Sequence, residues 1–239
     1  MNAETTHTFE KKPPWHQSVE EDGFTIIPGV LASHELIRLL AQLNDAPLRR
    51  SKAGVRHALA CAPVAALARD SRLLAIAQEI LRCTAFPFHA TLFDKSSGSN
   101  WLVPWHQDTA LPLRERREMQ GWGPWSVKIG VHYAHAPAKA LCQVLALRVH
   151  LDDSTSLNGP LRVLPGTHTR GVLSDDAIHE LAALTPAVEC LVPQGGVLAM
   201  RPLLVHSSSK SHADLPRRVL HIEYAASAVV DEGLELAVT

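Results

Sequence analysis

Hydrophobic residues recur at helical spacing in the first third of the chain. After Ser33, a residue type suited to capping a helix, leucines and an isoleucine gather on one side of a predicted helix. A second pattern of this kind follows Asp70-Ser71. We therefore expect a helix-rich support over residues 21–85, preceded by a loose N-terminal segment at 1–20.

Short apolar runs separated by turn-forming residues replace this pattern in the rest of the chain. Glycine, proline, serine and asparagine cluster between the runs, as is typical of β-strands joined by turns. The predicted strands are Phe24–Val30, Phe86–Phe93, Val144–Leu151, Leu161–Leu164, Val197–Arg201 and Val219–Tyr224. Many short strands after a helical region indicate a mainly β sandwich or barrel with flanking helices. We expect residues 1–239 to form one domain, with a β core over 86–230.

Residues 109–143 do not follow either pattern. They carry a run of charges, several prolines and the tryptophans Trp122 and Trp125. Long loops in compact domains are usually functional or disordered. We expect a lid or pocket wall here, with Trp122, Trp125 and Lys128 as candidate substrate contacts. Alternatively, the two tryptophans pack against the outer helices or a second subunit.

Composition narrows the functional classes. The 239 residues are 46% hydrophobic and carry a formal net charge of −1, so no overall field attracts nucleic acid or an anionic membrane. The four cysteines form no closely spaced pair, which argues against a disulfide scaffold. No apolar run is long enough for a signal peptide or a bilayer crossing. We expect a cytoplasmic protein that acts on a small molecule, and the pattern does not predict its oligomeric state.

The sharpest chemical feature is His106-Gln107-Asp108. Residues two apart on a strand point to the same face, so His106 and Asp108 are able to hold one ion together. A second histidine would complete a site with two histidines and one carboxylate, which leaves three metal positions open. His206, at the end of an apolar run, is the best candidate. The spacing alone is weak, because His150-Leu151-Asp152 shows it too.

A basic residue follows at a suitable distance. Arg217 lies eleven residues after His206, at the start of a predicted strand, so a turn and a returning strand would bring it near the metal. A guanidinium is well suited to bind the distal carboxylate of a dicarboxylic acid.

Several segments together resemble the phytanoyl-CoA dioxygenase family of Fe(II)- and 2-oxoglutarate-dependent oxygenases. These segments follow one another in the same order as in members of that family and cover roughly residues 86–225. The matching pieces are Leu92-Phe93-Asp94-Lys95, Trp105-His106-Gln107-Asp108, His150-Leu151-Asp152-Asp153, Asn158-Gly159-Pro160, Pro165-Gly166-Thr167-His168, Pro193-Gln194-Gly195-Gly196, His206 and Pro216-Arg217-Arg218.

The resemblance implies a double-stranded β-helix, also called a jelly roll or cupin-like barrel. It implies Fe(II), 2-oxoglutarate and dioxygen as the reactants at the site. The implied iron ligands are His106, Asp108 and His206. The implied co-substrate contacts are Arg217, Thr91 and Ser208, with Arg218 expected on the opposite strand face. Arg148 departs from the large residue of many relatives, and we expect it either to contact the co-substrate or an acidic substrate, or to be a paired structural arginine.

Asp108 also bears on the reaction type. Halogenating relatives replace this carboxylate with a small residue, so its presence implies hydroxylation or another oxidation of a C–H bond. Because the segment at 109–143 is unusual, the acyl-CoA substrate of the family is not assigned to this chain. Two other functions stay open on the residues alone: a zinc-binding cupin-like hydrolase, which would not need Arg217, and a non-catalytic binding protein on the same fold.

Overall fold

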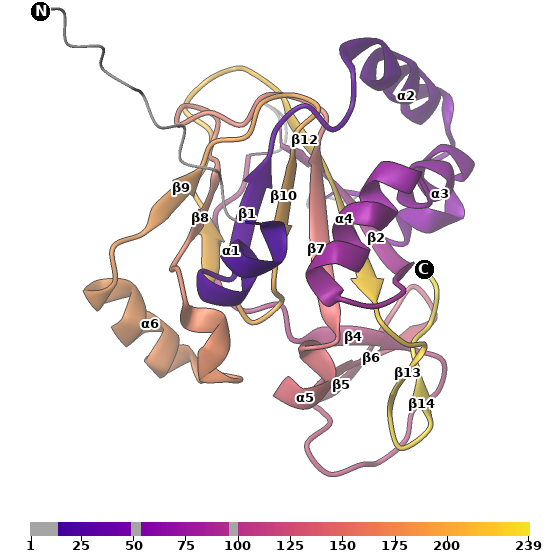
Figure 1. Ribbon diagram of the computed structural model, residues 1–239, viewed down its shortest axis with the longest axis vertical. Helices are drawn as coiled ribbons and strands as arrows, with labels where there is room; N and C mark the ends of the chain where they lie inside the picture. The colour runs from indigo at the N-terminus through magenta and orange to yellow at the C-terminus, as the bar shows by residue number, and fades with distance from the viewer. Residues whose placement is uncertain (1–13, 49–53, 96–99) are drawn as a thin grey trace, which may run out of the picture.

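Two antiparallel β-sheets form the centre of the computed structural model, which describes residues 14–48, 54–95 and 100–239 (Figure 1). The larger sheet contains, in spatial order, β1 (Phe24–Ile27), β10 (Val197–Met200), β7 (Val144–His150), β12 (Arg217–Ala225) and β2 (Phe86–Lys95). The smaller sheet contains β3 (Val103–His106), β11 (His206–Ser208), β8 (Leu161–Val163) and β9 (Val188–Cys190). The two sheets are hydrogen-bonded separately, so they form an open jelly roll. The predicted mainly β fold with flanking helices is confirmed.

The two faces of strand β12 (Arg217–Ala225) have different roles in the larger sheet. Successive side chains of a strand point to opposite faces. Leu220 and Tyr224 point outward into the main hydrophobic core, where the Tyr224 hydroxyl donates a hydrogen bond of 2.8 Å to a helix carbonyl. Arg217, His221 and Glu223 point inward and line a cavity. One face of the strand therefore holds the fold together, while the other carries polar groups.

Helices cover the outer face of the larger sheet (Figure 1). They are α1 (Trp15–Glu21), α2 (Ser33–Asp45), η1 (Ala58–Ala60), α3 (Ala62–Ala68) and α4 (Ser71–Leu81). Of the segment expected to be loose, residues 1–13 lie outside the described part of the chain. Residues 15–20 instead belong to α1, because Val19 is fully buried in the core. Within the described ranges, no helix combines the length and apolar character that a bilayer crossing needs.

The start of α2 differs from the sequence-based expectation. Ser33 is already helical, and Ala32 precedes the first turn as the N-cap residue. The Ala32 backbone N–H donates to the Glu35 carboxylate at 2.8 Å. The Glu35 side chain, in the first turn, therefore accepts a hydrogen bond from the backbone N–H of the N-cap residue. Ser33 is not the capping residue.

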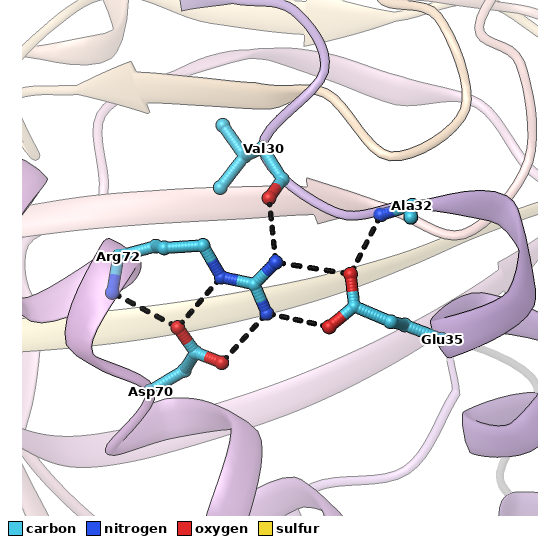
Figure 2. Close-up of polar contacts among 5 residues, drawn as sticks. All are labelled: Val30, Ala32, Glu35, Asp70 and Arg72. Carbon is cyan, nitrogen blue, oxygen red and sulfur yellow. Dashed lines mark hydrogen bonds and ion pairs between the residues drawn. The ribbon is translucent and has the colours of Figure 1, made fainter.

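Arg72 ties α4 to α2 and to the chain that enters it (Figure 2). Its guanidinium donates to the Glu35 carboxylate at 2.7 and 2.9 Å and to Asp70 at 2.8 and 2.9 Å. It also donates to the Val30 carbonyl at 3.0 Å. Hydrogen bonding to Arg72 is the main cause that lowers the pKa of Glu35 to about 2.

Replacing Arg72 with leucine is expected to lower the free energy of unfolding by about 1 kcal/mol, because a partly exposed charge network contributes modestly. Since the folded-state pKa of Glu35 is lowered from 4.5 to about 2, this stabilisation is present above pH 4.5 and is lost as the pH falls toward 2. Denaturant unfolding at pH 7 and pH 3 measures the difference. Arg38→Leu, at an exposed arginine on α2, is the control. A gap between Arg72→Leu and wild type that widens on acidification would contradict this account.

The segment at 109–143, expected to be a lid or pocket wall, contains a third sheet. Its strands are β4 (Ala110–Leu113), β5 (Trp125–Lys128) and β6 (Val131–His135), followed by the short helix α5 (Ala138–Leu141). The C-terminal hairpin, β13 (Val229–Asp231) and β14 (Leu234–Glu235), lies beside it (Figure 1). Leu111, Leu113, Trp122 and Leu234 share a second hydrophobic cluster. The same cluster includes Phe88, Val144 and Ala225 of the larger sheet, so it joins the segment to the central strands.

A smaller cluster supports the other sheet. The segments η2 (Thr167–Arg170) and α6 (Asp175–Leu184) follow β8. Ile178 of α6 packs with Leu164 and Val205, and Trp105 of β3 lies against this cluster. The ends of β3 and β11 are thus fixed from outside the cavity.

Candidate metal centre and cavity

Three side chains converge where β3 and β11 meet. His106 is the last residue of β3, His206 is the first of β11, and the two are register partners. The Asp108 carboxylate lies 3.6 Å from His106 Nε2 and 3.5 Å from His206 Nε2. One ligand atom from each residue lies within 4.8 Å of the others. The structure therefore brings together the two histidines and the carboxylate that the sequence singled out.

Backbone carbonyls orient both imidazole rings. His106 Nδ1 lies 2.9 Å from the Pro104 oxygen, and His206 Nδ1 lies 2.8 Å from the Leu204 oxygen. Because a carbonyl only accepts hydrogen bonds, each Nδ1 carries the proton and each Nε2 keeps its lone pair. Both Nε2 atoms face Asp108. This arrangement is typical of metal-binding histidines.

The charges of the three groups fit a cation. Burial lowers the pKa of His206 to about 4, so this ring is neutral near pH 7. Burial by itself would raise the pKa of Asp108, but His206 and His106 outweigh it and hold the carboxyl well below its usual range. Burial by itself would lower the pKa of His106, but the hydrogen bond and negative charge of Asp108 outweigh it and raise that pKa. Metal binding requires neutral imidazoles and an ionised carboxylate, so a bound cation would take the place of a proton on His106. The donor set therefore fits a divalent transition metal such as Fe(II).

The competing His150-Asp152 pair does not form a comparable group. His150 is buried, and neither of its ring nitrogens has a hydrogen-bond partner among the described residues. Asp152 instead binds Arg218, with bonds of 2.6 and 2.8 Å from the guanidinium. Arg218 thus points away from Arg217, as strand alternation predicted.

A cluster of basic groups lies at one end of the cavity. The Ser208 hydroxyl accepts hydrogen bonds from Lys95 Nζ at 3.0 Å and from Arg217 Nη2 at 3.2 Å. Lys95 and Arg217 are register partners on β2 and β12. Burial is the main cause that lowers the pKa of Lys95 to about 8 and that of Arg217 to about 10. No carboxylate among the described residues lies within 4 Å of either cation, so this end of the cavity is suited to an anion.

The Asn158-Gly159 turn holds this cluster in place. The Asn158 carbonyl accepts from Arg217 Nε at 3.2 Å, and the Gly159 carbonyl accepts from the Ser208 hydroxyl at 3.0 Å. Gly159 has φ +67°, and a Cβ there would meet the Ser209 carbonyl oxygen at 2.4 Å. Only glycine allows the two segments to approach this closely.

The two remaining co-substrate candidates also line the cavity. Arg148 is buried, and its Nη1 donates to His221 Nδ1 at 3.0 Å, while its guanidinium lies 5.3 Å from the Phe93 ring centroid. The Thr91 hydroxyl lies 3.3 Å from His89 Nε2. Arg148 is therefore engaged with the cavity wall, and Thr91 lies midway along β2, between Lys95 and His89.

The cavity has a volume of about 340 Å³, and residues of both central sheets line it. A volume in this range fits a small organic molecule. Lys128, Tyr133 and His135 also line it, so the segment at 109–143 does contribute a wall.

Trp122 and Trp125 do not line this cavity. Trp122 is buried in the second hydrophobic cluster and donates from Nε1 to Asp231 at 3.0 Å. Trp125 packs beside that cluster, 6.0 Å from the Arg116 guanidinium. Both rings are placed there because this cluster packs the third sheet against the central strands. The structure therefore does not bring these two of the three predicted substrate contacts to the site.

Several polar residues on the inner faces of β2 and β12 line the cavity but were not predicted as site residues from the sequence. They are His89, Lys95, His221 and Glu223. Their i, i+2 spacing within apolar strands was a usable signal: His89, Thr91, Phe93 and Lys95 alternate with core residues. The spacing within each strand does not show that these positions converge on one cavity, because that depends on the register of β2 against β12.

A jelly roll that holds two histidines and a carboxylate beside a small-molecule cavity is typical of non-haem iron oxygenases. The model of the phytanoyl-CoA dioxygenase family matches residues 19–219, and the chain belongs to that family.

Relatives agree with this membership. An L-proline trans-4-hydroxylase from Streptomyces griseoviridis is 24% identical over 243 aligned positions, which cover 85% of this chain and 82% of the relative. The crystal structure of AviO1 from Streptomyces viridochromogenes has a TM-score of 0.65 at 25% identity, covering 93% of this chain and 96% of that one. EctD from S. alaskensis, solved with 2-oxoglutarate and 5-hydroxyectoine, has a TM-score of 0.67 at 20% identity and covers 88% and 74%. The protein is accordingly an Fe(II)- and 2-oxoglutarate-dependent dioxygenase.

Proposed function

We propose that the protein hydroxylates a C–H bond of a small organic molecule, with His106, Asp108 and His206 as the iron ligands. The observation that carries this assignment is the pair of imidazole rings whose Nε2 atoms face one carboxylate while their Nδ1 atoms are fixed by carbonyls. Bound Fe(II), with 2-oxoglutarate and dioxygen, supplies an oxidising step that converts 2-oxoglutarate to succinate and carbon dioxide. Ligands on one face of the metal leave the other positions for co-substrate and oxygen.

The basic cluster would hold the distal carboxylate of 2-oxoglutarate. Arg217 and Lys95 offer two buried cations, and the Ser208 hydroxyl that they share orients both. A carboxylate bound there replaces the missing counter-charge, so its binding relieves the cost of two unpaired cations. A zinc hydrolase would have no use for this cluster.

Asp108 and the cavity walls favour hydroxylation of a small polar substrate. The aspartate occupies the position that halogenating relatives leave open, so no halide is expected beside the metal. The cavity is lined by histidines, Lys128 and Glu223 as well as by Phe93. An L-proline hydroxylase among the relatives is consistent with a substrate of this size and polarity.

We also propose that the chain acts as one oxygenase domain in the cytoplasm. A single family model that matches residues 19–219 supports one domain. All four cysteines are free thiols, which is typical of proteins in reducing compartments.

The direct test is spectroscopic. Anaerobic addition of Fe(II) and 2-oxoglutarate to the metal-free protein is expected to produce a visible charge-transfer band with a stoichiometry of one per chain. Zn(II) in place of Fe(II) should give no band, and air should then yield succinate from the Fe(II) sample. The absence of a band with Fe(II) would refute the proposed function, whatever the substrate is.

A further inference from the structure

Glu223 lies on the inner face of β12, at the opposite end of the cavity from the basic cluster. It is 7% exposed and lines the cavity, and it lies six residues along the strand from Arg217. At about 3.3 Å per residue the two backbone positions are roughly 20 Å apart. The register repeats this polarity on β2, where Lys95 faces Arg217 and His89 faces Glu223. The cavity therefore has a basic end and a separate end with a buried carboxylate.

The Glu223 carboxyl forms no ion pair with a lysine or arginine in the part of the chain that the structure describes. Its nearest ionisable neighbour is His89, whose Nε2 lies 3.9 Å away and so beyond hydrogen-bonding distance. His89 Nδ1 is 2.6 Å from the Thr239 hydroxyl, and burial lowers the pKa of His89 to about 3. Among the described residues no lysine or arginine lies within 4 Å of Glu223. A carboxylate buried without a partner is costly, which is typical of a group that meets its partner in a ligand.

Unpaired cations line the same end of the cavity. Lys128 Nζ lies 4.5 Å from the Tyr133 ring centroid, and Tyr133 is held by a hydrogen bond of 2.9 Å to His57 Nε2. Arg56 lies on the cavity wall nearby and lowers the pKa of Lys128, after the larger effect of burial. Neither cation is within 4 Å of a carboxylate among the residues that the structure describes. A buried carboxyl group and two cationic side chains thus share this end of the cavity without forming an ion pair.

We infer that this end of the cavity binds a small zwitterion, with its ammonium group at Glu223 and its carboxylate at Lys128 and Arg56. The substrate class is that of free amino or cyclic imino acids. This inference rests on the proposed function, because it places the zwitterion beside the metal ligands. A molecule that carries both charges satisfies both groups. A derivative without the ammonium group leaves the buried Glu223 carboxyl without a partner, and a derivative without the carboxylate loses the ion pair with the partly exposed Lys128 and the exposed Arg56.

A neutral Glu223 is the competing account of the same geometry. Burial raises the pKa of Glu223 to about 8, so without ligand the carboxyl is largely protonated near pH 7. A protonated carboxyl would donate to a neutral acceptor and would not select an ammonium group. The two accounts differ in which derivatives bind.

The test is calorimetric titration of the anaerobic protein loaded with Fe(II) and 2-oxoglutarate. The probes are a panel of L-amino acids and cyclic imino acids, each paired with its N-acetyl and its amide derivative. We expect at least one free zwitterion to bind, its N-acetyl derivative to bind more weakly by roughly 30-fold or more, and its amide to be weakened as well. Binding of N-acetyl compounds as tightly as the free acids, or no binding by any zwitterion, would overturn the inference.

Two variants separate the roles of the charges. Glu223→Gln should lose affinity for the free acid by roughly 30-fold or more. Lys128→Met should weaken the free acid but leave the affinity for its amide nearly unchanged. Glu189→Gln and Lys139→Met, outside the cavity, are the matched controls. The charge-transfer band with 2-oxoglutarate reports folding and co-substrate binding in each variant, so a failed proposed function shows as a missing band in the wild type. A Glu223→Gln protein that keeps the band and binds the zwitterion as tightly as wild type would contradict the inference.

Discussion

His206→Ala is expected to abolish measurable 2-oxoglutarate turnover and to weaken Fe(II) binding by more than about 100-fold. Loss of a residue that merely orients a metal ligand costs roughly 10–100-fold in metal affinity, and loss of a ligand should exceed that. His206 is 3% exposed and its ring is fixed by the Leu204 carbonyl, so no neighbouring group can easily replace it. Metal content after anaerobic loading and succinate formation measure the two effects.

The control for this variant is His212→Ala, at an exposed histidine in the loop after β11. It should bind one Fe(II) and form succinate as the wild type does. The melting temperature of each protein without metal shows whether the His206→Ala chain is folded. A folded His206→Ala protein that retains wild-type iron affinity would show that the metal binds elsewhere.

Arg217→Ala is expected to raise the KM for 2-oxoglutarate by roughly 30-fold or more. Truncation of one partner of a buried, hydrogen-bonded charge pair typically costs 2–5 kcal/mol. The value should lie toward the lower end, because Lys95 remains at Ser208 to bind the same carboxylate. Initial rates at saturating substrate, with 2-oxoglutarate varied, give the KM directly.

The neighbouring Arg218→Ala is a closely matched control. Arg218 lies on the opposite face of β12 and binds Asp152, so its loss should lower stability without a change in the KM for 2-oxoglutarate. Equal effects of the two substitutions on that KM would mean that the arginine is needed for the strand and not for the co-substrate.

The parts of the site that followed from sequence are those encoded by local spacing and by the order of motifs along the chain. Strand alternation separated Arg217 from Arg218. Asp108 lies two residues after His106, just beyond the end of β3, and the order of the surrounding motifs, not the spacing alone, distinguished this pair from His150-Asp152. The fold class followed from the change from helical to strand-like spacing. These features need no knowledge of which strands are neighbours.

The parts that were missed depend on contacts between distant segments. Lys95 joins the basic cluster only because β2 pairs with β12 in a register that sets it opposite Arg217. Trp122 was misplaced for a similar reason, since its partner Asp231 comes from a hairpin more than a hundred residues later. Spacing along the chain does not predict such partners.

Strand β12 fixes the distance between the two ends of the cavity, because Arg217 and Glu223 both lie on it. In the proposed function, Arg217 would bind the co-substrate and Glu223 would bind the far end of the substrate, and the distance between them is set by the six residues that separate them on one strand. Insertion of one residue between His221 and Glu223 would turn Glu223 toward the helices and an apolar neighbour toward the cavity. Preference for longer or shorter substrates is therefore more easily altered by replacing side chains around Glu223 than by changing the length of the strand.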